Sequence, residues 1–215
     1  MKTIKRLVVK VGTSTLTHSS GSLNLRNMEQ LVRVLADLKG GGLQVVLVTS
    51  GAIAVGAAHL GLAGRPEELR IKQAAAAVGQ CRMMHIYDKL FSEYNSKMAQ
   101  ILLTRDDVLD DSRARHLEGT FSALLELGVV PVVNENDSVS SAEIETGQHK
   151  VLGDNDTLSA VVAGLCHADL LVLLSDIDGL YSADPRENPQ ARLLHHVEEL
   201  TPKILEMAGG AGTWR

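Results

Sequence analysis

The chain of 215 residues contains little cysteine and few aromatic side chains. Its two cysteines, Cys81 and Cys166, are far apart, which excludes a disulfide framework and a CxxC metal or redox motif and favours a reducing cytoplasm. Aromatic residues make up 3% of the chain, too few for platforms that stack nucleic-acid bases. The core is therefore expected to consist mainly of Leu, Val, Ile and Ala.

The sequence also lacks a long apolar segment and an excess of basic charge. No stretch approaches the ~18 consecutive apolar residues of a membrane helix, and Lys10 interrupts the apolar residues that follow the N-terminal lysines, so no signal peptide is expected. Lys and Arg number 21 against 26 for Asp and Glu, a net charge of -5, and the basic residues are scattered. We expect a cytoplasmic protein that acts on small molecules and binds neither nucleic acid nor membrane.

Short apolar segments alternate with segments of helical period, a pattern typical of βαβ units and of a mainly parallel sheet covered on both faces. Pro131 lies within one predicted strand, which must then lie at an edge or pair only after the proline. The predicted strands cover residues 7–11, 45–49, 101–104, 129–134 and 170–175. Helices are predicted at 25–38, from Pro66 with breaks through 74–77, at 117–125 before Gly128, and after Asp156. The polar stretch 138–153 is predicted to be a hairpin or a lid.

Polar or glycine residues follow four of the five predicted strands, where open α/β sheets bind ligands. Lys10 is the most informative of the residues at these strand ends, because an unpaired ammonium is costly in a strand covered on both faces. It either reaches solvent from an edge strand or binds an anion. The adjoining Gly12 and Thr13 favour a clamp on phosphoryl oxygens.

The common nucleotide-binding motifs are missing. Gly51 and Gly56 have the spacing of a P-loop, but alanines follow where a lysine and a hydroxyl residue are required, and no GxGxxG follows the first strand. We interpret Gly51–Gly56 as close helix packing, with Ser50 and Gly51 at a helix N-terminus that could bind a carboxylate or phosphate. The eight histidines show no metal-ligand spacing, so no metal held by the protein alone is expected.

Acidic residues gather before the fourth predicted helix. Asp156 could simply cap that helix, but Asp154, Asn155 and Asp156 together could also orient a lysine, hold an ammonium or bind Mg²⁺ through water, and Asp137 could join them. Asp176, two residues before Asp178, fits a nucleotide-binding turn and a structural turn equally well.

Six blocks in order along the chain resemble the glutamate 5-kinases of the amino acid kinase family. The blocks are VVKVGTS at 8–14, VTSGAI at 48–53, LLTR at 102–105, VVNEND at 132–137, GDND at 153–156 and LYSADP at 180–185. The resemblance implies a three-layer α/β/α sandwich with an open, mainly parallel sheet. It also implies that ATP, with Mg²⁺, phosphorylates the γ-carboxylate of L-glutamate in the first step of proline biosynthesis.

The resemblance assigns a role to each candidate site residue. Lys10 and Asp156 would be catalytic, with Lys10 on the γ-phosphoryl group and Asp156 orienting it. The residues expected to bind substrate are Ser50, Gly51, Asp137 and Asn155, and those expected to bind phosphate or nucleotide are Lys10, Gly12, Thr13, Ser175 and Asp176. The resemblance further implies proline as a feedback inhibitor and a homo-oligomer, either a dimer or a tetramer.

The sequence departs from this family in two places. The segment 143–153 is longer, which predicts a longer substrate lid. The chain also ends before a glycine-rich loop and second lysine of the family, so we expect an amino acid kinase domain over 1–215 that is incomplete at its C-terminus and lacks an RNA-modification-type domain. The alternatives are a truncated, non-catalytic glutamate- or proline-binding module, a regulatory subunit, or another amino acid kinase such as an acetylglutamate or aspartate kinase, against which the block at 132–137 argues.

Overall fold

The computed structural model describes residues 3–140 and 155–208. The chain divides into a larger unit, Met1–Leu174, which holds all the described strands, and a smaller unit, Ser175–Arg215. None of the helices in these described ranges has the length and apolar composition needed to cross a membrane.

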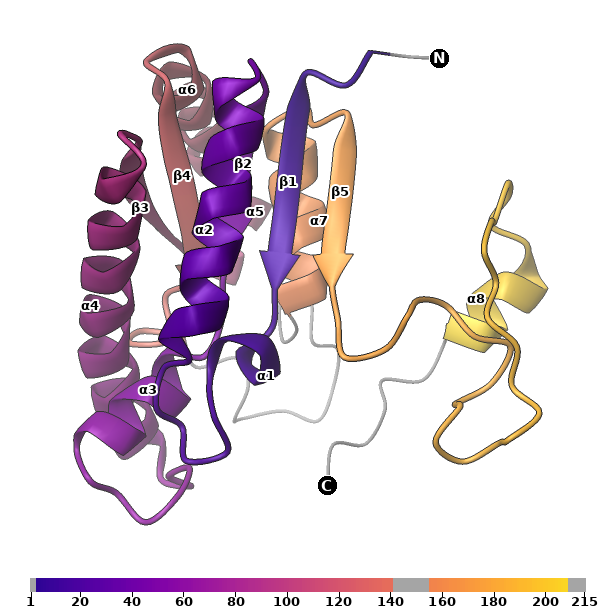
Figure 1. Cartoon of the computed structure of the whole chain (residues 1–215), viewed down its shortest axis with the longest axis horizontal. Helices are drawn as coiled ribbons and strands as arrows, with labels where there is room; N and C mark the ends of the chain where they lie inside the picture. The colour runs from indigo at the N-terminus through magenta and orange to yellow at the C-terminus, as the bar shows by residue number, and fades with distance from the viewer. Residues whose placement is uncertain (1–2, 141–154, 209–215) are drawn as a thin grey trace. The chain divides into compact units, whose positions relative to one another are not determined.

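The larger unit contains one sheet whose strand pairs are all parallel, in the order β3-β4-β2-β1-β5 (Figure 1). The bounds are β1 Arg6–Val11, β2 Gln44–Val48, β3 Lys97–Leu103, β4 Val129–Glu135 and β5 Leu170–Leu174. The predicted strands are confirmed, with differences at their ends. The start of β3 at Lys97, earlier than predicted, has a physical reason: its first residues include Lys97 and Gln100, both exposed, and so lack an apolar run.

The strand β4 is internal to the sheet despite Pro131. Its pairing with β3 runs through the proline, whereas its pairing with β2 begins at Val132. The second of the two predicted alternatives is therefore confirmed on the β2 side. Proline has no N–H to donate, so a neighbouring strand can pair fully across it only on the side that does not need that donor.

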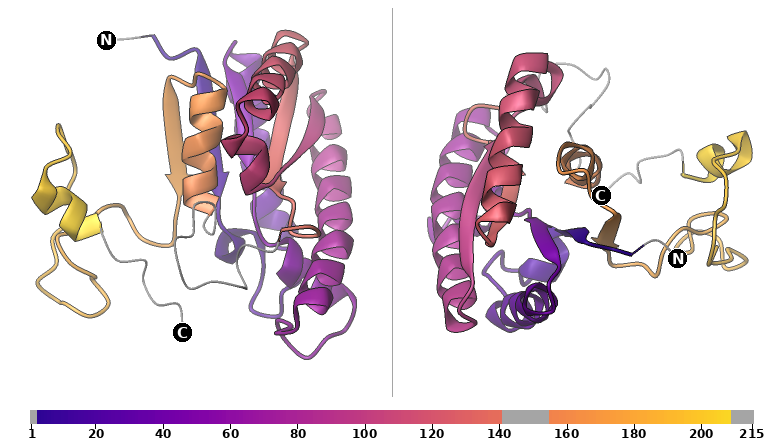
Figure 2. Two further views of the ribbon diagram at one scale, coloured as in Figure 1. Left: turned by 180° about the vertical axis from the view of Figure 1, so that it is seen from behind. Right: turned by 90° about the horizontal axis from the view of Figure 1, so that it is seen from above.

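Helices cover both faces of this sheet, which confirms the three-layer sandwich (Figure 2). One face carries α2 (Leu25–Gly40) and α4 (Leu69–Glu93), and the other carries α6 (Asp111–Glu126) and α7 (Asn155–Leu165). The shorter helices are α1 (Thr13–Leu16), α3 (Ala52–His59) and α5 (Arg105–Leu109), with α8 (Pro202–Ala208) in the smaller unit.

The side chains of β1 alternate between the two cores. Leu7, Val9 and Val11 pack with α2 and α4, whereas Val8 packs in the core that α6 and α7 cover. Successive residues of a strand point to opposite faces, so Lys10 shares the face of Val8. This alternation directs the lysine toward the layer that contains α7.

Two of the helix predictions need correction. The helix α4 begins at Leu69 with Glu68 at its N-cap, so the prediction that Pro66 forms its first turn is wrong. The predicted breaks are wrong too, because α4 runs for 25 residues through 74–77. Alanine has the highest helix propensity, so the tract favours an unbroken helix.

The other helix predictions hold, except at the start of α7. The helices α2 and α6 confirm the predicted segments at 25–38 and 117–125. In α7, Asp156 lies inside the helix rather than at its N-cap, so capping does not explain this residue. Most of the predicted hairpin or lid at 138–153, together with Asp154, lies outside the described residues.

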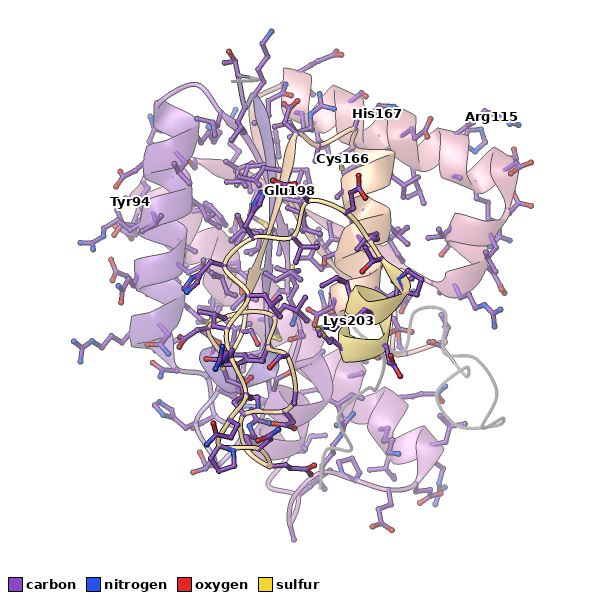
Figure 3. All side chains as sticks on the ribbon, turned by 90° about the vertical axis from the view of Figure 1, so that its right-hand side faces the viewer. Tyr94, Arg115, Cys166, His167, Glu198 and Lys203 are labelled. Carbon is purple, nitrogen blue, oxygen red and sulfur yellow. The ribbon has the colours of Figure 1, made fainter. Side chains whose placement is uncertain are left out.

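Hydrogen bonds away from the carboxyl ends of the strands join α4 to α2 within one layer and the sheet to the layer that contains α7. Tyr94, which is labelled in Figure 3, follows α4 and donates to Glu29 of α2. The Arg6 guanidinium of β1 donates to the carbonyl of Cys166, directly after α7. Burial raises the pKa of the Cys166 thiol to about 12, so this cysteine is an inert part of the core.

Candidate active site

A largely buried lysine and an aspartate meet at the carboxyl edge of the sheet. Lys10 Nζ of β1 lies 2.6 Å from Asp156 Oδ1 in the first turn of α7. The lysine side chain is 11% exposed and the aspartate side chain 47% exposed. The carboxylate therefore compensates an ammonium that is largely removed from water, and holds it at the edge of the site. The predicted contact between these two residues is present.

The loop after β1 passes close to this ammonium. A Cβ added to Gly12 would stand 3.6 Å from Lys10 Nζ. Thr13 Oγ1, at the start of α1, lies 3.2 Å from Ser50 Oγ at the end of β2. Ser50 Oγ also donates to the Val11 carbonyl oxygen over 3.2 Å. The ends of β1 and β2 are therefore joined by hydroxyl groups beside the lysine.

Gly51 is required where β2 passes into α3. Its φ of +99° lies in the left-handed region, which glycine adopts without steric cost. A side chain there would also crowd Thr13, because a Cβ would stand 3.1 Å from Thr13 Cγ2. Gly51 thus lets the chain turn sharply into α3 while Thr13 and Ser50 remain in contact.

A chain of hydrogen bonds connects α4 to the start of α7 through β2. Asn155 Nδ2 donates to the Thr49 carbonyl oxygen over 3.1 Å, and Thr49 Oγ1 lies 3.0 Å from the Tyr87 hydroxyl oxygen. Thr49 and Tyr87 are fully buried, and this burial raises the pKa of Tyr87, which keeps its hydroxyl protonated. The network fixes the Asn155 side chain at the first residue of α7, directly before Asp156. No sequence pattern marked Tyr87, because its partner is 38 residues away.

A cavity of about 380 Å³ opens between α4 and the ends of β3 and β4. Ala52, the residue after Gly51, is one of its lining residues, so the cavity adjoins the loop that carries Ser50. Asp137, predicted to bind substrate, lines it together with Gln80 and Cys81. The cavity is large enough for one small molecule.

The larger unit brings most of the predicted site residues together at one edge. These residues are Lys10, Gly12, Thr13, Ser50, Gly51, Asn155 and Asp156, with Asp137 in the adjoining cavity. Ser175 and Asp176 belong to the smaller unit, where Asp176 pairs with Arg186 at 2.6 Å. Their contact with a nucleotide stays a prediction, as do the chemical roles of the other residues.

Residues 5–212 match the model of the amino acid kinase family. The chain belongs to the amino acid kinase family. This amino acid kinase is 53% identical over 215 residues to the glutamate 5-kinase of Clostridium perfringens, an alignment that covers 100% of this chain and 79% of that protein. It is 56% identical over 211 residues to the glutamate 5-kinase of Moorella thermoacetica, covering 98% of this chain and 54% of that protein.

These relatives confirm the predicted resemblance to glutamate 5-kinases, and the chain spans between about half and four fifths of their length. The solved UMP kinase of Ureaplasma parvum superposes with a TM-score of 0.58 at 14% identity, covering 96% of this chain and 86% of the other. That likeness supports the fold alone. The predicted boundaries of a single domain over 1–215 stay a prediction.

Proposed function

We propose that this amino acid kinase uses ATP to phosphorylate the γ-carboxylate of L-glutamate, forming γ-glutamyl phosphate and ADP in the first step of proline biosynthesis. The observation that carries this proposal is the Lys10 ammonium, largely buried, held 2.6 Å from Asp156 and beside the Gly12 loop. A fixed cation next to backbone N–H groups suits the charge of a transferring phosphoryl group.

The chemistry relies on positioning and electrostatics. One γ-carboxylate oxygen attacks the γ-phosphorus, and the new O–P bond forms as the bond to the β,γ-bridging oxygen breaks and ADP leaves with its electron pair. The carboxylate is ionised at neutral pH, so no general base is needed. Lys10, held by Asp156, neutralises the negative charge on the γ-phosphoryl oxygens, and the loop at Gly12 and Thr13 contributes hydrogen-bond donors.

The substrate lies, in this proposal, between the cavity and the Lys10 edge. The Asp137 carboxylate in the cavity takes the α-ammonium as an ion pair, whereas Ser50, Gly51 and Asn155 align the rest of the molecule toward Lys10. Ser175 and Asp176 of the smaller unit bind the nucleotide.

Mg²⁺ enters with the nucleotide in this proposal. In the part of the chain that the structure describes, no three or more His, Cys, Asp or Glu side chains gather as metal ligands. Magnesium bound mainly by phosphates needs only one or two carboxylates, and Asp156 at the edge could provide one through water. The ion supplies further neutralisation of phosphate charge.

The proposal extends to three properties of the whole protein. Proline, the end product, acts as a feedback inhibitor; copies of the chain assemble as a dimer or tetramer; and the protein works in the cytoplasm. Size-exclusion chromatography with light scattering checks the assembly, and inhibition of ADP release by proline checks the feedback.

Trapping of γ-glutamyl phosphate with hydroxylamine tests the reaction itself. The purified chain with ATP, Mg²⁺ and L-glutamate should form γ-glutamyl hydroxamate and one ADP per product. Lys10→Ala should lower turnover by roughly 10²–10³-fold, typical for the loss of one electrostatic donor, while glutamate binding measured by calorimetry changes little. Lys97→Ala, at an exposed lysine that starts β3, is the matched control. Phosphorylation of a different amino acid, or full activity of Lys10→Ala, would overturn the proposal.

A further inference from the structure

The cavity beside the Lys10 edge contains a glutamine with an incomplete set of hydrogen bonds. Gln80 of α4 lines the cavity and is only 8% exposed. Its Oε1 accepts a hydrogen bond of 2.9 Å from Asn134 Nδ2. Its Nε2 is buried and has no partner among residues 3–140 and 155–208. Buried donors are nearly always satisfied, because burial removes the hydrogen bonds that water supplies.

The partner of this glutamine sits in the segment that carries the predicted substrate residue. Asn134 is 2% exposed near the end of β4, three residues before Asp137. Turning over one amide alone would set two donors or two acceptors against each other, and turning over both would leave the carbonyl of Gln80 spare in place of its amino group. In the orientation that the structure gives, the spare donor is Gln80 Nε2.

The surroundings of Gln80 on α4 give no packing reason for a polar side chain. One turn before it stands Ala76, and one turn after it stand Met83 and Met84, all buried. Residues three and four positions apart share a helix face, so Gln80 interrupts an apolar face. A polar group at such a position is destabilising unless it has a partner. Asn134 is the partner of Oε1, and a ligand in the adjoining cavity would provide one for Nε2.

We propose that Gln80 is a substrate-specificity residue, whose Nε2 donates a hydrogen bond to a carboxylate oxygen of the amino acid bound in this cavity. The inference rests on the proposed function and deepens it. An amide donor facing a carboxylate forms a charge-assisted hydrogen bond, and Asp137 on the same cavity offers the opposite charge for the ammonium. A zwitterion needs both kinds of group.

Glutamate binding to the full chain, measured by calorimetry, tests this role. Gln80→Met keeps the length of the side chain and resembles the neighbouring methionines, whereas Gln80→Glu keeps an acceptor for Asn134 and replaces the donor by a charged oxygen that repels a carboxylate. We expect both variants to bind glutamate at least tenfold more weakly, about 1.4 kcal/mol. Gln73→Met, on the same helix but away from the cavity lining, should bind like the parent.

The unfolding midpoint separates this role from a structural one. A specificity role predicts that at least one Gln80 variant unfolds cooperatively near the parent midpoint while its glutamate affinity is lost. A folded variant with parental affinity would overturn the inference. Failure of both variants to fold would do the same, because it would assign Gln80 a purely structural role.

The reactivity of Cys81 locates the ligand independently of activity. Cys81 is exposed and lines the cavity, whereas Cys166 is buried, so a thiol reagent such as DTNB reports on Cys81. Glutamate should slow this reaction in the parent over the concentration range of its Kd. Glutamate that binds without slowing it would place the ligand elsewhere and overturn the inference alone. A parent that neither binds glutamate nor forms hydroxamate would overturn the proposed function as well.

Discussion

Replacement of glycine by alanine should have opposite effects on stability at Gly56, where α3 contacts α4, and at Gly119, which lies away from that contact. Gly56 of α3 and Gly79 of α4 stand where the two helices touch. A Cβ added to Gly56 would overlap the Ala75 carbonyl oxygen, and would lie 2.6 Å from the Ala75 carbonyl carbon and 2.9 Å from the Gly79 nitrogen. Backbone atoms cannot rotate out of the way, so an alanine must push the helices apart.

Gly119 of α6 provides the contrast, since nothing lies within 4 Å of the position that its Cβ would take. There only helix propensity changes, and alanine should stabilise the protein by about 1 kcal/mol. At Gly56 the same gain is opposed by overpacking, which costs roughly 1–3 kcal/mol for side chains and more for backbone overlap. We expect Gly56→Ala to lose about 3 kcal/mol, which places the two variants about 4 kcal/mol apart.

Urea unfolding followed by circular dichroism measures this difference, with the slopes compared to establish that the midpoints are comparable. Gly164→Ala in α7, where nothing lies within 4 Å either, is a second control that should behave like Gly119→Ala. A midpoint for Gly56→Ala at or above that of the parent would refute the reasoning. A Gly119→Ala variant less stable than Gly56→Ala would refute it equally.

Two further predictions concern single hydrogen bonds. Tyr87→Phe removes the hydroxyl that contacts Thr49, so it should lower the unfolding free energy by about 1 kcal/mol and raise the KM for glutamate through Asn155; an unchanged KM would contradict the positioning network. The hydrogen bond from the Thr104 hydroxyl outweighs the opposing effect of burial and holds the pKa of Asp107 below 3.8. This carboxylate therefore stabilises the fold above that pH, and its contribution is lost as pH falls through the lower folded pKa. The parent should therefore lose more stability from pH 6 to pH 3 than Asp107→Asn does, and equal losses in urea titrations would show that Asp107 contributes nothing.

Local sequence patterns predicted the elements well wherever an element is apolar in a regular period. The five strands were found from runs rich in Val, Leu and Ile, and Pro131 correctly limited the pairing of β4 with β2. Errors arose where local preferences left several starting points open. Pro66 suits a first helical turn, yet α4 begins at Leu69, and the polar first half of β3 carries no strand pattern.

The sequence alone determined the fold class, the family resemblance and the residues at the strand ends, because these depend on local periodicity and on contiguous blocks. Lys10 was marked by its place inside an apolar strand, but its partner 146 positions later became a contact only through strand alternation and the docking of α7. Gln80 and Tyr87 carry no local mark at all: their chemistry depends on Asn134 and Thr49, which packing of α4 against the sheet brings within hydrogen-bond distance. Tertiary structure decides such pairs because a buried polar group is defined by its partner, and the partner is distant in sequence.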